Sequence, residues 1–114
     1  METTELILLY DYYGDLLTNR QKECFELRYD QDLSLSEIGQ ELGISRQGVH
    51  DNLSRTEALL QNMEAKTGCV RRDRACRKAS GMIANLAKLL SEYEDPHVSD
   101  LAKQILAQCA GLEE

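Results

Sequence analysis

The 114-residue chain contains no tryptophan, one proline and few aromatic residues, and it has no apolar run long enough to cross a bilayer. A membrane-spanning helix needs about 20 predominantly apolar residues, and a secretory signal needs a basic segment followed by an apolar stretch. Since both are missing, we expect a cytoplasmic protein with no membrane contact. The scarcity of proline and of β-branched residues removes most signals for a sheet, so the predicted fold class is all-α.

Close cysteine pairs are also missing. The four cysteines form no C-x-x-C motif, and only Cys69 and Cys76, seven residues apart, could share a helix face. Two such ligands without a histidine or a second pair do not complete a structural metal site. We therefore expect no metal, no cofactor and no disulfide framework. Buried, reduced thiols are predicted at Cys24, Cys69, Cys76 and Cys109.

No catalytic arrangement is recognisable in the sequence. The chain lacks a glycine-rich phosphate loop and a nucleophile beside a base, and its scattered carboxylates are typical of a solvated surface. His50 has no second ligand or nucleophile near it in the sequence, so an exposed or packed histidine is the simpler interpretation. We therefore predict that the protein is not an enzyme.

Charge is distributed unevenly along the chain, although the formal net charge is −7. Residues 1–33 carry three basic and eight acidic groups, residues 34–65 carry two and five, and residues 89–114 carry one and six. Residues 66–88, in contrast, carry seven basic groups and one acidic group. One basic block is therefore embedded in an acidic chain.

Apolar residues recur at three- and four-residue steps and predict six helices. We expect these helices over about residues 6–14, 18–30, 34–43, 45–66 and 70–90, and from Pro96 onward. The predicted buried faces are Leu6, Leu9, Tyr13 and Leu16 in the first helix, Ala75, Ala79, Met82, Ile83, Leu86, Leu89 and Leu90 in the fifth, and Val98, Leu101, Ile105 and Leu106 in the sixth, with Ala102 or Cys109 beside them.

The most specific pattern joins two predicted helices through a turn with almost no spare residue. Ser34 and Glu37 have the spacing of a capping box, in which each side chain accepts a hydrogen bond from the backbone N–H of the other. Gly43 suits the left-handed conformation that ends a helix, and Ser45 is a good N-cap for the next one. Residues 35–53 are therefore predicted to form a helix-turn-helix whose second helix projects outward.

That second helix has the width to enter the major groove of DNA, where outward side chains in its N-terminal half read base edges. Asp51 would repel phosphates unless it accepts a hydrogen bond from a cytosine amino group. For Arg46 and Gln47, the alternative is that they are solvated residues near the helix cap. The candidate reading residues are Arg46, Gln47, His50, Asp51, Ser54 and Arg55.

The strongest positive cluster lies in the basic block, where Arg74, Arg77 and Lys78 would share one side of a helix. Because Lys and Arg drive most non-specific nucleic-acid affinity, we expect the cluster to contribute at least as much affinity as the reading helix, with RNA competing with DNA. The alternative is an intramolecular counter-charge to the acidic flanks. The cluster consists of Arg71, Arg72, Arg74, Arg77 and Lys78.

Residues 16–66 resemble region four of the sigma factors of bacterial RNA polymerase. Two departures are Gly48, where the sigma pattern usually has threonine, and residues 50–52, where a basic residue is common. The resemblance is carried by Leu17-Thr18-Asn19-Arg20-Gln21, Phe25-Glu26-Leu27-Arg28-Tyr29, Leu33-Ser34-Leu35-Ser36-Glu37-Ile38, Leu42-Gly43-Ile44-Ser45, and Val49, Leu53, Ser54 and Arg55.

Within that superfamily the chain looks most like the YlxM family of helix-turn-helix proteins. Members are typically encoded beside genes for the signal recognition particle and its receptor, so the resemblance implies a regulatory or accessory role in protein targeting, with components of that particle as partners. The likeness rests on Ser45-Arg46-Gln47, Asp51-Asn52 and Arg55-Thr56-Glu57.

These patterns predict a helix-turn-helix domain over residues 1–67 and a C-terminal helical extension with the basic cluster over residues 68–114. The aliphatic density of the extension suggests a homodimer, and the alternative is that its helices pack back on the first and fourth. The preferred function is non-enzymatic regulation through nucleic acid or the targeting machinery. The alternatives are a sequence-specific transcription regulator that binds promoter DNA, and a protein-interaction module that has lost DNA reading.

Overall fold

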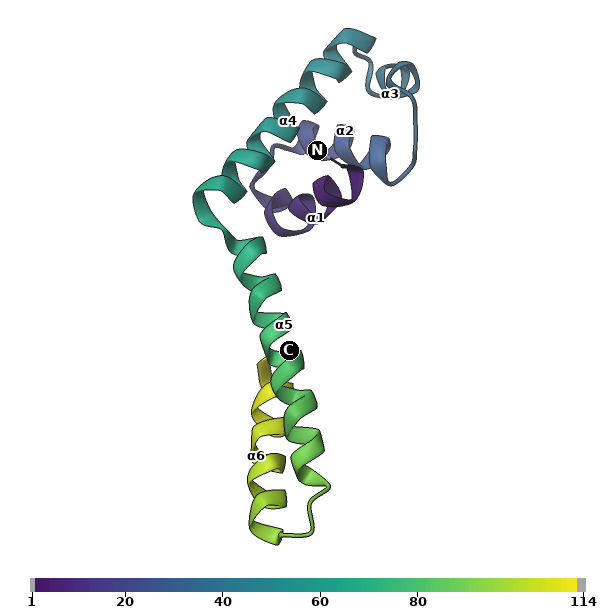
Figure 1. The fold of residues 1–114 in the computed structure, drawn as a ribbon. Helices are drawn as coiled ribbons and strands as arrows, with labels where there is room; N and C mark the ends of the chain where they lie inside the picture. Colours follow the sequence, from purple (N-terminus) through teal and green to yellow (C-terminus); the bar gives the residue numbers. More distant parts are fainter. Residues whose placement is uncertain (1, 113–114) are drawn as a thin grey trace. The chain divides into compact units, whose positions relative to one another are not determined.

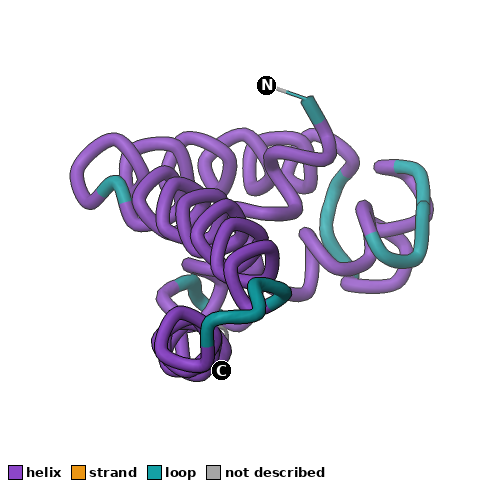
Figure 2. The backbone as a smooth tube through the Cα atoms, turned by 60° about the horizontal axis from the view of Figure 1, so that its bottom comes forward, coloured by secondary structure: helices purple, strands orange, loops and turns teal. Residues whose placement is uncertain are grey.

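The computed structural model describes residues 2–112, and all of the regular structure in this range is helical (Figure 1). Only short loops join the helices, as Figure 2 shows. The all-α prediction is confirmed. The elements are α1 (Thr3–Tyr13), the short 3-10 helix η1 (Gly14–Leu16), α2 (Asn19–Tyr29), α3 (Leu35–Leu42), α4 (Arg46–Thr67), α5 (Cys69–Ser91) and α6 (Pro96–Leu112).

Side-chain caps fix where α2 and α3 begin. The Thr18 hydroxyl accepts from the Gln21 N–H at 3.2 Å, and the Gln21 side chain accepts from the Thr18 N–H at 2.9 Å. Ser34 and Glu37 form the same reciprocal pair, with both distances 3.1 Å. The hydrogen bond from the Ser34 backbone lowers the pKa of Glu37, because it favours the ionised carboxylate. The predicted capping box is therefore present.

The chain divides into two compact units, and the boundary falls inside α5. We call residues up to Val70 the N-terminal unit and residues from Arg71 onward the C-terminal unit. The N-terminal unit holds α1 to α4 and the first residues of α5. The C-terminal unit holds the rest of α5 and α6.

The N-terminal unit has a core in which α1, α2 and α4 meet. The prediction that Leu16 is buried was wrong: its side chain is 71% exposed, and Leu17 is buried instead. The reason is that the chain leaves the α-helix after Tyr13 and makes a 3-10 turn with three residues per turn, which shifts the inward position by one. This core contains Leu6, Leu9, Tyr13, Leu17, Phe25, Leu60 and Val70.

A hydrogen-bonded group ties α1 to the joint between α4 and α5. The Tyr13 hydroxyl donates to Glu64 Oε1 at 2.6 Å, and the same carboxylate oxygen accepts from the Val70 backbone N–H at 3.0 Å. The hydroxyls of Tyr13 and Thr67 lie 2.6 Å apart. Gly68, with φ of 64°, ends α4 in the left-handed conformation and allows α5 to start directly afterwards.

The C-terminal unit is an antiparallel hairpin of α5 and α6 (Figure 1). Leu112, at the end of α6, lines the same hollow as Cys76 and Ser80 near the start of α5. At the turn, the Ser99 hydroxyl donates to the Ser91 carbonyl at 3.3 Å. The buried side chains of the hairpin are small: Ser80 and Ala87 on α5, and Ala102 and Cys109 on α6.

Several expectations for this hairpin were wrong. In a hairpin of two helices, each helix buries only the side that faces the other helix. Small residues occupy that side of both helices, so the larger apolar residues stay exposed to solvent. Cys69 and Cys76 are exposed, whereas Cys24 and Cys109 are buried, and none of the four forms a disulfide within residues 2–112. The residues predicted as buried but found exposed are Ala75, Ala79, Met82, Ile83, Leu86, Leu89 and Leu90 on α5, and Leu101 and Ile105 on α6.

None of the helices between residues 2 and 112 combines the length and apolarity needed to cross a membrane.

Tyr13→Phe should lower the free energy of unfolding by about 1–2 kcal/mol at neutral pH, because Glu64 loses a donor. Burial and the Glu64 hydrogen bond raise the pKa of Tyr13 above its ordinary value of 10.0. The neutral phenol therefore stabilises the fold fully below pH 10, and this contribution is lost as pH rises through the folded-state pKa. Urea unfolding from neutral to alkaline pH should show a shallower alkaline decline for Tyr13→Phe than for the parent; equal declines would contradict the assignment.

Candidate nucleic-acid interface

The bend between α3 and α4 is built from three consecutive residues. Gly43 adopts φ of 72°, in the left-handed region that suits glycine, and ends α3. The Ile44 N–H then donates to the Gly39 carbonyl at 3.0 Å. Ser45 caps α4 by accepting from the Gly48 N–H at 2.9 Å. The helix-turn-helix predicted for residues 35–53 is therefore present, with its turn at Gly43.

Gly39 allows the backbones on the two sides of the bend to approach closely. A Cβ at this position would lie 2.7 Å from the Ile44 carbonyl oxygen, closer than real Cβ atoms come to backbone. The interior of the bend is filled by Cys24, Ile38 and Val49, which are fully buried. Sequence reasoning missed Gly39, and the signal that could have found it is a glycine in a helix where alanine would be favoured.

The predicted reading residues lie on the exposed side of α4. Val49 points into the core of the bend and is 0% exposed, whereas Asn52 and Leu53 are half-buried. The first turns of α4 therefore present one polar surface outward, and their packing against α3 fixes its direction. The exposed residues of this surface, which we call the reading face, are Arg46, Gln47, His50, Asp51, Ser54 and Arg55.

Asp51 is already engaged within the reading face. The Gln47 side-chain amide donates to Asp51 Oδ1 at 2.9 Å, and His50 Nδ1 lies 3.6 Å from the same oxygen. The carboxylate therefore has neighbours that offset part of its repulsion toward a phosphate, most strongly when His50 is protonated. Arg46 and Arg55 supply the two formal positive charges of the face.

The basic cluster lies on the part of α5 that belongs to the C-terminal unit, whereas the reading face belongs to the N-terminal unit. Arg77 Nε lies 3.3 Å from Asp73 Oδ2, one helical turn earlier. Arg74 and Lys78 are also one turn apart and are exposed. All five cations of the cluster, Arg71, Arg72, Arg74, Arg77 and Lys78, are exposed to solvent.

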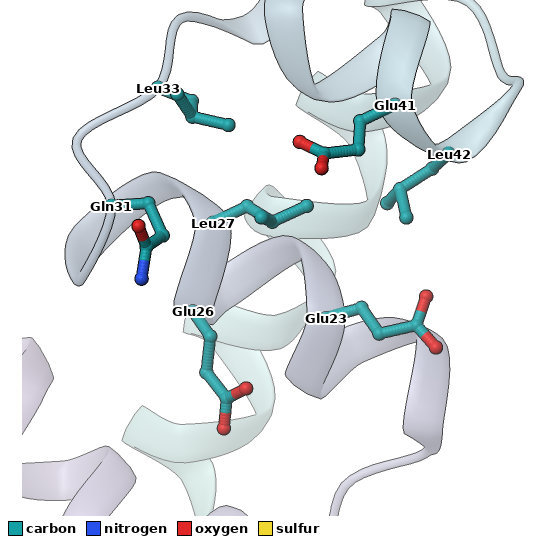
Figure 3. A pocket seen from close by; sticks show the side chains of 7 residues that line it. All are labelled: Glu23, Glu26, Leu27, Gln31, Leu33, Glu41 and Leu42. Carbon is teal, nitrogen blue, oxygen red and sulfur yellow. The ribbon is translucent and has the colours of Figure 1, made fainter.

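An acidic groove that sequence reasoning missed lies between α2, α3 and the loop joining them (Figure 3). It has a volume of about 530 Å³ and an apolar floor. In Figure 3 the Glu41 carboxylate reaches over the space between Leu33 and Leu42. Such a surface repels phosphate and suits a cationic, partly apolar ligand. Its lining residues are Glu23, Glu26, Leu27, Gln31, Leu33, Glu41 and Leu42.

Within residues 2–112, no group of three or more His, Cys, Asp or Glu side chains is arranged to hold a metal ion.

A capped, rigid bend that presents the first turns of its second helix to solvent defines a helix-turn-helix protein. The sequence model of the UPF0122 family, described as "Putative helix-turn-helix protein, YlxM / p13 like", matches residues 1–96. The chain belongs to this family, and the predicted YlxM likeness is confirmed.

Bacterial relatives share most of the chain. The UPF0122 protein of Thermoanaerobacter sp. (strain X514) is 42% identical over 101 residues, which cover 88% of this chain and 86% of that protein. The UPF0122 protein of Bacillus mycoides (strain KBAB4) is 40% identical over 105 residues, covering 92% and 91%. That of Bacillus anthracis (strain A0248) is 39% identical over the same length and coverage.

Gly39→Ala should destabilise the protein by about 1–3 kcal/mol, because the new Cβ overpacks the Ile44 carbonyl. The matched control is Gly81→Ala on α5, where nothing lies within 4 Å of the added atom. That substitution should stabilise its helix by up to about 1 kcal/mol. Urea unfolding followed by circular dichroism measures both. A neutral Gly39→Ala would show that the bend does not depend on the close approach.

Proposed function

We propose that the protein is a non-enzymatic regulator that binds nucleic acid through the reading face and the basic cluster. The observation that carries this proposal is that one side of α4 between Arg46 and Ser54 is exposed, while Val49 on the other side of the helix is buried. In this proposal residues 1–67 orient the contact, and residues 68–114 supply phosphate-binding charge. We propose further that the protein acts as a homodimer, since α5 and α6 leave large apolar residues in solvent.

Phosphate binding by the basic cluster predicts a charge-dependent loss of affinity. Arg74→Glu combined with Arg77→Glu should abolish retention on heparin and flatten the salt dependence of binding to a duplex DNA, because each cation that contacts phosphate releases counterions. The control is Lys66→Glu combined with Lys103→Glu, which changes the net charge equally at exposed sites outside the cluster. Equal retention of the two double variants would remove the cluster from the proposal.

Base reading makes a separate prediction about α4. Arg46→Ala combined with Gln47→Ala should relax the sequence preference found by selection from a random duplex pool, at about 1–3 kcal/mol for each lost bidentate base contact. A parent protein that shows no preference in this selection would exclude the sequence-specific promoter-binding alternative. It would leave phosphate binding by the basic cluster intact.

The acidic groove favours one second candidate function, a protein-interaction module that binds a basic partner. Three glutamates line this groove together with three leucines, and the Gln47–Asp51 hydrogen bond occupies part of the reading face. A role in protein targeting stays a prediction from the family resemblance. Recovery of bound RNA, DNA and protein from a bacterial extract distinguishes nucleic-acid binding from binding of a basic partner protein. The groove variant in this experiment combines Glu23→Gln and Glu41→Gln.

A further inference from the structure

The acidic groove between α2 and α3 has walls that hydrogen bonds hold in place (Figure 3). On one wall, the Leu33 N–H donates to the Leu27 carbonyl at 3.0 Å, and Arg28 Nη1 donates to the Leu33 carbonyl at 2.9 Å. On the other, Arg20 Nη1 donates to the Leu42 carbonyl at 3.3 Å and joins α2 to the end of α3. A ligand therefore meets a preformed groove, which lowers the cost of ordering the site on binding.

Three leucines give the groove its apolar lining. Leu27, Leu33 and Leu42 are half-buried, and they pack against the fully buried residues that fill the bend between α3 and α4. Because this packing holds the leucines in place, part of their apolar surface stays in contact with water. An apolar side chain of a partner that covered this surface would gain stability from the hydrophobic effect.

The Glu26 carboxylate is held by a neutral donor. The Tyr10 hydroxyl donates to Glu26 Oε1 at 2.7 Å. Burial raises the pKa of Tyr10 above its ordinary value of 10.0, and the hydrogen bond to Glu26 adds to the rise, so the phenol is uncharged at neutral pH. This hydrogen bond therefore fixes the position of the Glu26 carboxylate without supplying a counter-charge.

The other two groove carboxylates also lack strong counter-charges. Glu41 is exposed and forms no ion pair with any of residues 2–112. Figure 3 shows its carboxylate over the space between Leu33 and Leu42. Glu23 has one long, half-exposed ion pair, in which its carboxylate lies 4.0 Å from Arg20 Nη1. The groove therefore keeps a negative charge that attracts a cationic ligand.

The backbone around the groove offers a ligand little to pair with. Four carbonyl groups that border it already accept hydrogen bonds within the N-terminal unit: those of Glu26, Leu27, Leu33 and Leu42. The regular structure of residues 2–112 is helical and provides no strand edge. An extended segment would leave its own N–H and C=O groups unpaired against the leucines, whereas a helix satisfies them internally. A helical ligand is therefore favoured over an extended one.

We propose that the acidic groove is the docking site for a cationic amphipathic helix of a partner protein. The apolar side of this helix covers the three leucines, and lysine or arginine side chains beside it pair with Glu26 and Glu41. The groove volume of about 530 Å³ corresponds to roughly one turn of helix, about 5.4 Å long and about 10–12 Å wide with its side chains. The inference rests on the second candidate function, binding of a basic partner, and does not depend on nucleic-acid binding.

Fluorescence anisotropy with the full chain and no nucleic acid tests the docking site. The probe is a labelled synthetic helix of about 18 residues with leucine on one face and lysine on the other. Glu23→Gln combined with Glu41→Gln should weaken its binding about 5- to 10-fold, because two carboxylates no longer attract lysine. The control, Glu2→Gln combined with Glu5→Gln, changes the net charge equally at exposed sites on or beside α1, and it should stay within about twofold of the parent protein.

Equal weakening by the two double variants would overturn the docking site, because net charge alone would then explain the binding. Circular dichroism checks that both variants keep the helical content of the parent protein. An absence of binding to the parent protein at up to about 100 μM peptide also overturns the inference.

Two matched peptides separate an amphipathic helix from a simple polycation. One has the same composition in a scrambled order, so that its leucines do not share a face, and the other carries a proline at its centre, which breaks the helix. Both should bind at least about 5-fold more weakly than the amphipathic helix. Equal binding of the scrambled peptide overturns the apolar contact, and equal binding of the proline peptide overturns the helical conformation. Retention on heparin and recovery of proteins from an extract are separate measurements, so the inference and the proposed functions can fail independently.

Discussion

The N-terminal unit depends on the close backbone approach at the bend between α3 and α4. With no Cβ on Gly39, the Ile44 carbonyl can lie against α3 while the Ile44 N–H bonds to the Gly39 carbonyl. Gly43 supplies the left-handed residue that makes this reversal possible. Arg20 then ties α2 to the end of α3 by donating to the Leu42 carbonyl at 3.3 Å. The direction of α4, and hence of the reading face, follows from these backbone constraints.

Features set by local chemistry could be predicted from the sequence, and features set by tertiary packing could not. Caps such as Ser34 and Ser45 act within three residues of the chain, so the starts of α3 and α4 were correctly predicted. The burial of Leu17 in place of Leu16 depends on a 3-10 turn that periodicity does not reveal. Apolar periodicity on α5 predicts an amphipathic helix, but it does not tell whether the same chain covers that face.

The candidate site was only partly visible for the same reason. The residues of the reading face lie on consecutive turns of one helix, so their spacing in the sequence is enough to predict that they share a face. The acidic groove combines Glu23 and Glu26 from α2 with Glu41 from α3, and no linear pattern joins residues so far apart. Net charges summed over long stretches of the sequence also hide how acidic and basic groups are separated on the surface. The acidic groups of the N-terminal unit gather partly at the groove, while the first turns of α4 carry the exposed Arg46 and Arg55.

The two units differ in how much apolar surface they bury. The N-terminal unit buries Phe25, Leu60 and Ile38 within itself, and at about 25 cal/mol per Å² such side chains provide most of the stability of a small domain. The C-terminal unit buries alanine, serine and cysteine, which offer little apolar area, and the Ser80 hydroxyl has no hydrogen-bond partner among the described residues. Its large apolar residues contribute only when another surface removes them from water. The stability of the hairpin therefore rests on little buried apolar area, in contrast to that of the N-terminal unit.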